Sequence, residues 1–339
     1  MLRRISAIAH SAPLLGAIPA SVRALAMALA CLVPCAAFAQ GYPSKPIRFI
    51  VRAPPGGTDD LIARLMQAAV SKALGQSVVI DYRPGAGGLV AWEYVSKQPP
   101  DGYTMLLAAS GLAAIKTLRT DATLDPFRDL AWVTEVTSFM LILLSHPSLP
   151  AKNIPELIAL AKKRPGELSY GSSGIAATPH LAAEYFKAVA KVNINHVPYK
   201  GAGPMYLDLF SGRIELGAAV VGGALPHVRN GKVRALGVTG AKRSDQLPDV
   251  PTMAESGLKG FAFDPFYAIV VAAGTPRDIV NALADGIAKG MSSPEFRAQF
   301  LKVVGSAVAT STPEQMVQMA KKEAELIDRI VRTSGIKLE

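Results

Sequence analysis

The chain has 339 residues, with 36 Lys and Arg against 26 Asp and Glu and a formal net charge of +10. The basic residues are dispersed and aromatic residues make up only 6%, which argues against a nucleic-acid partner because nucleic-acid-binding surfaces concentrate basic and aromatic side chains. Three arginines precede residue 40, so the remaining chain carries 33 basic and 26 acidic residues, a charge of +7 that favours anionic ligands.

The first 39 residues have the pattern of a secretory signal peptide. Arg3 and Arg4 precede an apolar stretch that ends in AAFAQ, where Ala37 and Ala39 flank one residue in an A-x-A pattern. We therefore expect a signal peptide over residues 1–39 and cleavage after Ala39. Two alternatives are a retained membrane anchor and a lipoprotein signal at LVPC (32–35), which Pro34 disfavours.

Both cysteines, Cys31 and Cys35, lie within this leader, which excludes disulfide, cysteine-zinc and cysteine-nucleophile chemistry in the mature chain. About 300 residues remain, a length that usually forms two domains. No later apolar run reaches membrane-spanning length, so we expect a soluble product outside the cytoplasm.

Strand and helix patterns alternate after the leader. The β-branched runs are PIRFIV (46–51), SVVIDY (77–82) and YTMLLAA (103–109), and the first two enclose a helix-period stretch at 59–74. This alternation predicts an α/β fold with mostly parallel sheet. We expect Thr58 or Asp59 to cap the first helix and Gly75 to end it.

Two segments predict passages between domains. Prolines interrupt the chain around 143–150, and the strand pattern changes again around 261–276. We therefore assign domain 1 to residues 40–143 plus 268–339 and domain 2 to 144–267. Two lobes joined by two crossings enclose a cleft, the usual place for a small ligand.

The first glycine turn lies in IVRAPPGGTDDLIARL (50–65), between a strand and a helix. The N–H groups at the start of a helix and its partial positive charge favour a carboxylate or phosphate, and the lysine of a Walker loop is missing. A tight turn without a ligand is the alternative. The candidate ligand-binding residues here are Pro55, Gly56, Gly57, Thr58 and Asp59.

A second turn, GAGGLV (85–90), approaches a dinucleotide-binding fingerprint. Val90 occupies the third small position and no acidic partner follows, so we do not predict a dinucleotide site.

The third turn, YGSSGIAATPH (170–180), offers hydroxyl groups beside backbone amides. Its glycines and serines miss the G-x-S-x-G spacing by one residue, which excludes a nucleophile elbow. His180 is interpreted as a packed or capping histidine, with a catalytic base as the alternative. The candidates are Ser173, Gly174, Ala176, Ala177 and Thr178, together with Ser110.

A fourth turn, at 196–212, contributes Tyr199, which either lines the cleft or belongs to the core. Lys200 is interpreted as solvated and Asp208 as orienting loop backbone. The mature histidines show neither H-x-x-x-H nor H-E-x-x-H spacing, and no carboxylate pair stands out. The sequence therefore predicts binding without a metal, a cofactor or catalytic residues.

Several segments, in this order, carry a resemblance to the Bug family, the periplasmic receptors of tripartite tricarboxylate transporters. They are YPSKPIRFIV (42–51), PPGGTDDLIAR (54–64), LGQSVVIDYRPGAGG (74–88), PPDGYTMLLA (99–108), HVPYKGAGP (196–204), DLFSGRIE (208–215), GKVRALGVTGAKRSDQLPDVPTMAESGL (231–258) and GTPRDIV (274–280). The resemblance implies a two-lobed, type II-like periplasmic-binding-protein fold and a periplasmic location. It also implies a ligand carboxylate held by backbone amides, hydroxyls and water, and membrane partners from the transporter.

Three features depart from the family pattern. Arg52 and Ala53 replace a proline and an aromatic residue, which widens the pocket and leaves Arg52 either as an added positive charge or turned to solvent. Ala219 stands at the position of an expected acid, which disfavours an amino-acid ligand, and Phe266 replaces a common tryptophan.

Together these observations predict a monomeric receptor for a small organic anion, a mono- or dicarboxylate with an aliphatic or aromatic body. Tyr199 and Ala219 complete the predicted ligand-binding residues. A hydrolase or isomerase on the same scaffold, and a ligand sensor that feeds a signalling partner, are the alternatives.

Overall fold

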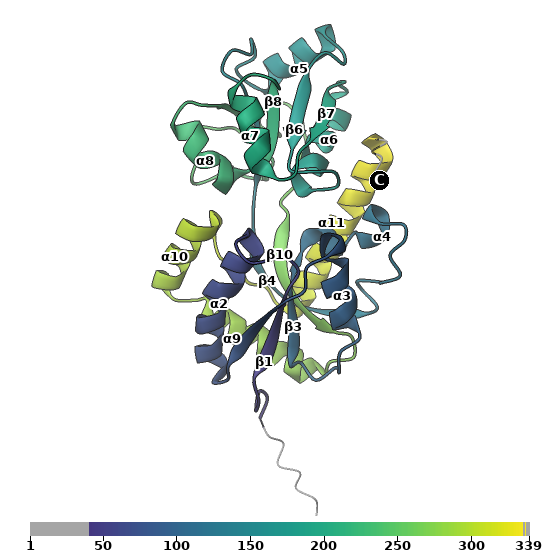
Figure 1. Cartoon of the computed structure of the whole chain (residues 1–339), viewed down its shortest axis with the longest axis vertical. Coiled ribbons are helices and arrows are strands. Elements are labelled where there is room, and N and C mark those ends of the chain that lie inside the picture. The colour runs from purple at the N-terminus through teal and green to yellow at the C-terminus, as the bar shows by residue number, and fades with distance from the viewer. Residues whose placement is uncertain (1–40, 335, 337–339) are drawn as a thin grey trace, which may run out of the picture. The chain divides into compact units, whose positions relative to one another are not determined.

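Two mixed five-stranded sheets organise the chain in the computed structural model, which describes residues 41–334 and 336 (Figure 1). The first sheet has the order β2-β1-β3-β10-β4 and comprises β1 (Ile47–Val51), β2 (Val78–Tyr82), β3 (Thr104–Ala109), β4 (Leu130–Ser138) and β10 (Phe266–Ala272). The second has the order β7-β6-β8-β5-β9 and comprises β5 (Leu141–Ser145), β6 (Ser169–Ser172), β7 (Asn195–Pro198), β8 (Leu216–Val220) and β9 (Arg234–Val238). We call the parts built on them lobe I and lobe II. The predicted signal peptide, with Cys31 and Cys35, lies outside the described residues.

Helices cover both sheets. In lobe I they are α2 (Thr58–Leu74), η1 (Ala86–Gly88), α3 (Leu89–Ser96), η2 (Ser110–Leu112), α4 (Ile115–Leu118), α9 (Arg277–Gly290), α10 (Pro294–Val304) and α11 (Pro313–Ser334). In lobe II they are α5 (Ile154–Lys163), α6 (Thr178–Ala190), α7 (Ala202–Phe210) and α8 (Val221–Arg229).

Strand β1 shows why both faces of the first sheet are covered. Phe49 packs in one apolar cluster with Met66 of α2, whereas its neighbour Ile50 packs in another cluster with Trp92 of α3. Successive strand side chains point to opposite faces, so an apolar run is buried on both sides only when helices cover both.

The prediction of mostly parallel sheet holds for four of the five strands in each sheet, which run in one direction, whereas the fifth strand is antiparallel to both of its neighbours. β10 runs antiparallel to β3 and β4, and β5 runs antiparallel to β8 and β9. β5 and β10 are the strands by which the chain enters a lobe from the other lobe. They therefore point away from the other lobe, whereas their neighbours in the sheet point toward it. The same strand pattern in both lobes confirms the predicted two-lobed, type II-like fold.

The chain changes sheets between Ser138 and Leu141 and again between Val238 and Phe266. The predicted domain boundaries, after residues 143 and 267, would cut β5 and β10. We propose boundaries near residues 140 and 265 instead, because a strand belongs to the lobe whose sheet it joins.

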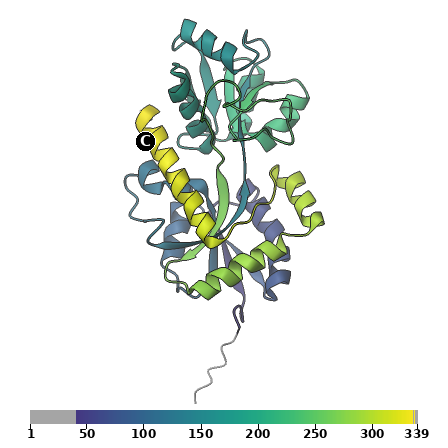
Figure 2. The same cartoon turned by 180° about the vertical axis from the view of Figure 1, so that it is seen from behind.

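Helix α11 contributes to both lobes. Its first half places Met316 and Ala320 in a lobe I cluster, and its second half places Ile327 and Ile330 in the lobe II core with α6. Figures 1 and 2 both show α11 running from beside the first sheet to the side of α6. The helix therefore ties the two lobes together beside the crossing strands.

Helix α2 ends as predicted and begins differently. Gly75, with a φ of +68°, is its C-cap. Gly57, rather than Thr58 or Asp59, is its N-cap, and no side chain caps it there. Over the described residues, no helix combines the length and the apolar character needed to span a bilayer.

Candidate functional site

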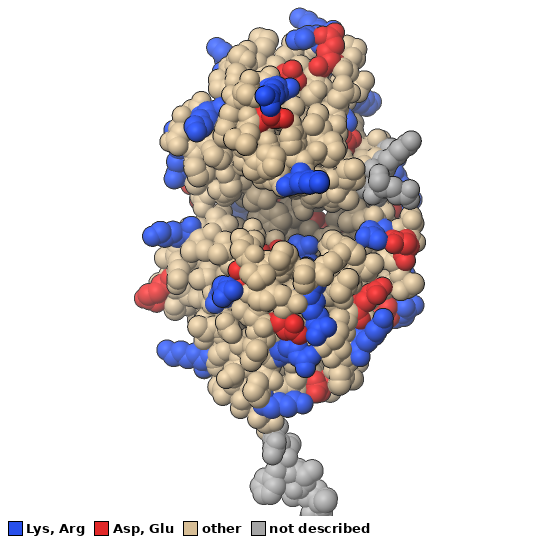
Figure 3. Space-filling view, viewed as in Figure 1, with Lys and Arg blue, Asp and Glu red and all other residues tan. Residues whose placement is uncertain are grey.

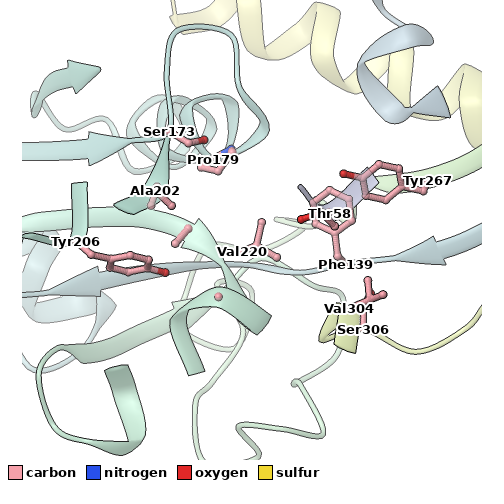
Figure 4. A pocket seen from close by; sticks show the side chains of 13 residues that line it. Thr58, Phe139, Ser173, Pro179, Ala202, Tyr206, Val220, Tyr267, Val304 and Ser306 are labelled. Carbon is pink, nitrogen blue, oxygen red and sulfur yellow. The ribbon is translucent and has the colours of Figure 1, made fainter. Parts of the chain in front are cut away.

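A cavity of about 240 Å³ lies between the two lobes (Figure 4). It is lined by Thr58, Phe139, Ser173, Pro179, Ala202, Tyr206, Ala218, Ala219, Val220, Gly223, Tyr267, Val304 and Ser306. We call it the hydroxyl cavity, because its only polar side chains are hydroxyls and no charged residue belongs to this lining. Figure 3 shows a hollow between the lobes whose visible walls are mostly uncharged.

The hydroxyl cavity lies where several helices begin. Thr58 is the first residue of α2, Pro179 the second of α6, Ala202 the first of α7, and Val220 immediately precedes α8. The first N–H groups of a helix lack partners within the helix and carry partial positive charge. Four such starts around one cavity favour an anionic ligand.

Three hydroxyls of the cavity have no protein partner among the described residues: those of Thr58, Ser173 and Tyr206. Tyr206 is the most informative, because its side chain is only 7% exposed and its hydroxyl is fully buried. Burial raises the pKa of this phenol, so it stays protonated and can donate. By contrast, the Ser306 hydroxyl lies 2.8 Å from that of Thr137.

A second cavity, of about 530 Å³, adjoins the first and shares Ser173 and Pro179 with it. Its lining is Arg52, Ala86, Gly87, Trp92, Ala109, Gly111, Ile115, Leu118, Arg119, Ser173, Ile175, Ala176, Ala177, Thr178 and Pro179. We call it the arginine cavity, since Arg52 and Arg119 are the charged residues of this lining.

Arg52 is not turned to solvent, which decides between the two alternatives left open by the sequence. Its Nε lies 2.9 Å from Oδ2 of Asp59, a carboxylate that is 5% exposed. The Tyr267 hydroxyl donates to Oδ1 of Asp59 at 3.0 Å. Asp59, a predicted ligand-binding residue, is therefore held in an ion pair between the two cavities.

The first glycine turn is held by Asp60. Its carboxylate accepts hydrogen bonds from the Tyr82 hydroxyl, from Gly56 N–H at 2.8 Å and from Arg64 at 2.7 Å. These bonds, with that of Tyr82 the strongest, lower the pKa of Asp60. The Gly56 N–H is thus already used, while the N–H groups of Gly57 and Thr58 precede the first bond within the helix, from Leu61 to Gly57.

The predicted ligand-binding residues fall into three groups. Thr58, Ser173 and Ala219 line the hydroxyl cavity, and Ala176, Ala177 and Thr178 line the arginine cavity with Ser173. The remainder, outside both linings, are Pro55, Gly56, Gly57, Asp59, Ser110, Gly174 and Tyr199. A ligand role for each of these residues stays a prediction.

Tyr199 and Ser110 contact other protein groups instead. The Tyr199 hydroxyl donates to Asp208 at 2.9 Å, and desolvation and this bond raise the pKa of Tyr199 to about 12. The Asp208 carboxylate accepts from Tyr199 and Arg213 side chains, rather than orienting loop backbone as predicted. Ser110 is 2% exposed and lies near Glu323, a buried carboxyl group whose pKa is raised by burial.

Two stacked histidines support the loop that carries Ser173. The rings of His180 and His196 are 4.0 Å apart; His180 Nδ1 accepts from Ala176 N–H at 3.0 Å, and His196 Nε2 lies 2.7 Å from the Ser172 hydroxyl. Burial lowers the pKa of each histidine to about 4, so both are neutral at physiological pH. His180 is a packed histidine that fixes a loop, which agrees with the first of its two interpretations.

Five residues that line the two cavities were not predicted from the sequence: Tyr206, Phe139, Tyr267, Trp92 and Arg119. Tyr206 lies on α7, after Gly201, and no sequence pattern distinguishes it from a core tyrosine. The others reach the cleft from segments far apart in the chain. Among the described residues, no group of three His, Cys, Asp or Glu could hold a metal ion.

Residues 62–336 match the family described as "Tripartite tricarboxylate transporter family receptor". The protein BugT of Bordetella pertussis is 34% identical over 89% of this chain and 93% of its own length. The R. palustris protein Rpa4515, solved with adipate, is 34% identical with a TM-score of 0.74 and covers 87% of this chain and 99% of its own. MatC from Rhodopseudomonas palustris, with bound malate, is 28% identical with a TM-score of 0.69, covering 86% and 100%.

These similarities extend over both lobes and confirm the resemblance that the motifs carried. The family consists of solute-binding receptors rather than enzymes, in agreement with the prediction that the chain has no catalytic role. The chain belongs to the receptor family of the tripartite tricarboxylate transporters.

Proposed function

We propose that this receptor captures a small organic anion, a mono- or dicarboxylate, in the hydroxyl cavity. The observation that carries the proposal is the buried Tyr206 hydroxyl, which has no partner among the described residues and lines one cavity with Thr58, Ser173 and four helix starts. The hydroxyl groups and the helix N–H groups can donate hydrogen bonds without carrying a full charge, and such donors are complementary to a carboxylate. Such neutral donors also permit release, which a receptor requires.

The same cavity disfavours an amino acid. Ala219 offers no charge to a ligand ammonium, and the neighbouring Asp59 carboxylate is already paired with Arg52. Burying an ammonium without a partner is unfavourable. Relatives solved with adipate and malate support the carboxylate class.

We further propose that the chain acts as a monomer in the periplasm, after cleavage behind Ala39, and delivers its ligand to the membrane components of a tripartite tricarboxylate transporter. The family match and the A-x-A pattern support this role. Mass spectrometry of the exported protein should give a mature chain that begins at Gln40. A retained leader, or a lipid on Cys35, would contradict this maturation.

The ligand class can be tested by calorimetric titration with malate and aspartate, which share a carbon skeleton but differ in a hydroxyl and an ammonium. We expect malate to bind more tightly than aspartate, with one ligand per chain. Chromatography of the released ligand should show it unchanged. Tighter binding of aspartate would overturn the carboxylate assignment, and conversion of the ligand would indicate an enzyme.

A further inference from the structure

The arginine cavity is lined by two guanidinium groups, and the aspartates that pair with them, Asp59 and Asp121, lie outside its lining. Arg52 and Arg119 both line it, and no Asp or Glu does. Each guanidinium also binds a carbonyl of the second glycine turn, Arg52 that of Gly87 at 3.3 Å and Arg119 that of Ala86 at 3.4 Å. The carbonyls of Ala86 and Gly87 are consecutive in the chain, so the two guanidinium groups lie beside the same turn.

Both arginines retain donors. Arg52 faces Asp59, and Arg119 binds Asp121 through Nε and Nη2 at 3.0 and 2.7 Å. A guanidinium has five N–H groups, and the contacts to the aspartates and to the turn carbonyls use three of them on each arginine, so two N–H groups remain on each. The free N–H groups suit a carboxylate, which accepts two parallel hydrogen bonds from one arginine.

Trp92 supplies an independent observation. It is 4% exposed, it lines the arginine cavity, and its indole Nε1–H is buried without a partner among the described residues. A side chain built on Gly88 would meet Trp92 Cζ2 at 2.8 Å and Arg52 Cδ at 2.9 Å. The indole and the Arg52 stem therefore flank the same glycine. A buried donor of this kind needs an acceptor, and a ligand in the cavity can provide it.

The rest of the cavity suits a hydrocarbon body. Ile115 and Leu118 line it from lobe I, and Ile175, a large apolar side chain with 47% exposure, lines it from lobe II. Ser173 and Pro179 belong to both linings, so the two cavities are neighbours. The apolar side chains lie between the hydroxyl groups of one cavity and the Arg52, Arg119 and Trp92 donors of the other. This arrangement is complementary to a molecule with a hydrocarbon body and a carboxylate at each end.

We propose that the arginine cavity is a distal anion subsite, and that the ligand is an extended dicarboxylate. One carboxylate lies in the hydroxyl cavity and the other meets Arg52, Arg119 and Trp92. This inference rests on the proposed function and goes further, because it selects dianions over monoanions. Arg119 and Trp92 are its specificity-determining residues.

The test is a calorimetric series with unbranched dicarboxylates from succinate to suberate and monocarboxylates of equal carbon number. We expect the longer dicarboxylates to bind at least about tenfold more tightly than their monocarboxylate counterparts, since only they reach the second group of donors. Arg119→Gln and Trp92→Phe should each remove most of this advantage. Trp92→Phe keeps an aromatic ring and deletes the N–H donor. Arg128→Gln, which breaks an exposed pair with Asp129 outside both cavities, is the matched control.

The outcomes separate the two proposals. Equal affinities for dicarboxylates and monocarboxylates, or equal effects of Arg119→Gln on both, would overturn the distal subsite and leave the proposed function intact. Failure of every carboxylate to bind would overturn both. Arg119 has a side chain that is 38% exposed, so its variant tests the subsite even if Trp92→Phe disturbs folding.

Discussion

At the scale of single residues, substitution of Tyr206 distinguishes a hydroxyl that binds ligand from one that stabilises the fold. Its hydroxyl is buried and has no partner in the described part of the chain, so Tyr206→Phe removes no hydrogen bond of the ligand-free fold there. We expect carboxylate affinity to fall by about 0.5–1.5 kcal/mol, while the melting temperature without ligand stays equal or rises. Calorimetry and thermal unfolding measure the two quantities.

The control for this prediction is Tyr42→Phe. The Tyr42 hydroxyl donates to the Gly102 carbonyl at 2.7 Å, away from both cavities. Its loss should lower stability and leave ligand affinity unchanged. A Tyr206→Phe variant that behaved in the same way would assign its hydroxyl to the fold.

Thr58 and Ser173 give a second prediction. Thr58→Ala and Ser173→Ala should each weaken carboxylate binding by about 0.5–1.5 kcal/mol, and by more if a buried carboxylate is left short of donors. Thr310→Ala, an exposed threonine outside the cleft, is the control. Parallel losses of affinity and melting temperature would show that these hydroxyls serve the turns.

Thr58 and Ser173 could be found from the sequence, because each lies in a glycine-containing turn between a strand and a helix, Thr58 at the helix start and Ser173 directly after the strand. Trp92, Arg119 and Tyr206 could not be found as site residues in this way. Their roles depend on which hydroxyl or N–H lacks a partner after folding, and this is a property of tertiary contacts.

At the scale of elements, α6 and β7 are joined by His180 and His196. The pKa of each is lowered from 6.5 to about 4, mainly by burial. The native state therefore binds fewer protons than the unfolded state between pH 4 and 6.5. The free energy of unfolding should rise with pH across this window, and the stabilisation is lost as the pH falls toward 4.

An NMR titration assigned by substitution tests this pH dependence. Two imidazoles should titrate near pH 4, and their protonation should perturb the amide signals of the loop that contains Ser173. If both rings titrated near pH 6.5 instead, burial would not keep them uncharged. That result would contradict the role of their neutral nitrogens in holding this loop.

The backbone of α8 at Gly222 lies close to the end of α10 at Gly305. A Cβ added to Gly222 would lie 3.0 Å from the Gly305 Cα, which is backbone and cannot move aside as a side chain can. Gly222→Ala should therefore hold the lobes further apart, weaken ligand binding and increase the radius of gyration of the ligand-bound protein. Small-angle scattering with saturating ligand measures this change.

Gly203→Ala is the matched variant for that experiment, because it lies in the first turn of α7 and its added methyl group would meet nothing within 4 Å. It should scatter like the wild type. If Gly222→Ala also scattered like the wild type and bound ligand normally, the glycine contact would not limit closure.

The elements themselves were predictable to different degrees. β1, β2, β3 and α2 lie where the β-branched runs and the helix period indicated. The antiparallel β5 and β10 were not predicted, since periodicity along one strand contains no information about the direction of its neighbour.

At the scale of the whole chain, the two-lobed fold followed from the Bug-family motifs, which extend through both lobes. The contacts of α11 with both lobes could not be predicted from the sequence. Its apolar face follows one helix period, and only the folded structure shows that Met316 faces the core of lobe I and Ile327 that of lobe II.

The most direct test of the account is a thermal-shift screen of organic acids, amino acids, sugars and neutral amides. A ligand that binds only the folded receptor stabilises it by mass action, by about 2.7 kcal/mol at roughly 100 times its Kd. We predict that dicarboxylates raise the melting temperature most and that amino acids raise it little. The largest shift from an amino acid or a neutral sugar, with none from any carboxylate, would contradict an organic-anion site between the lobes.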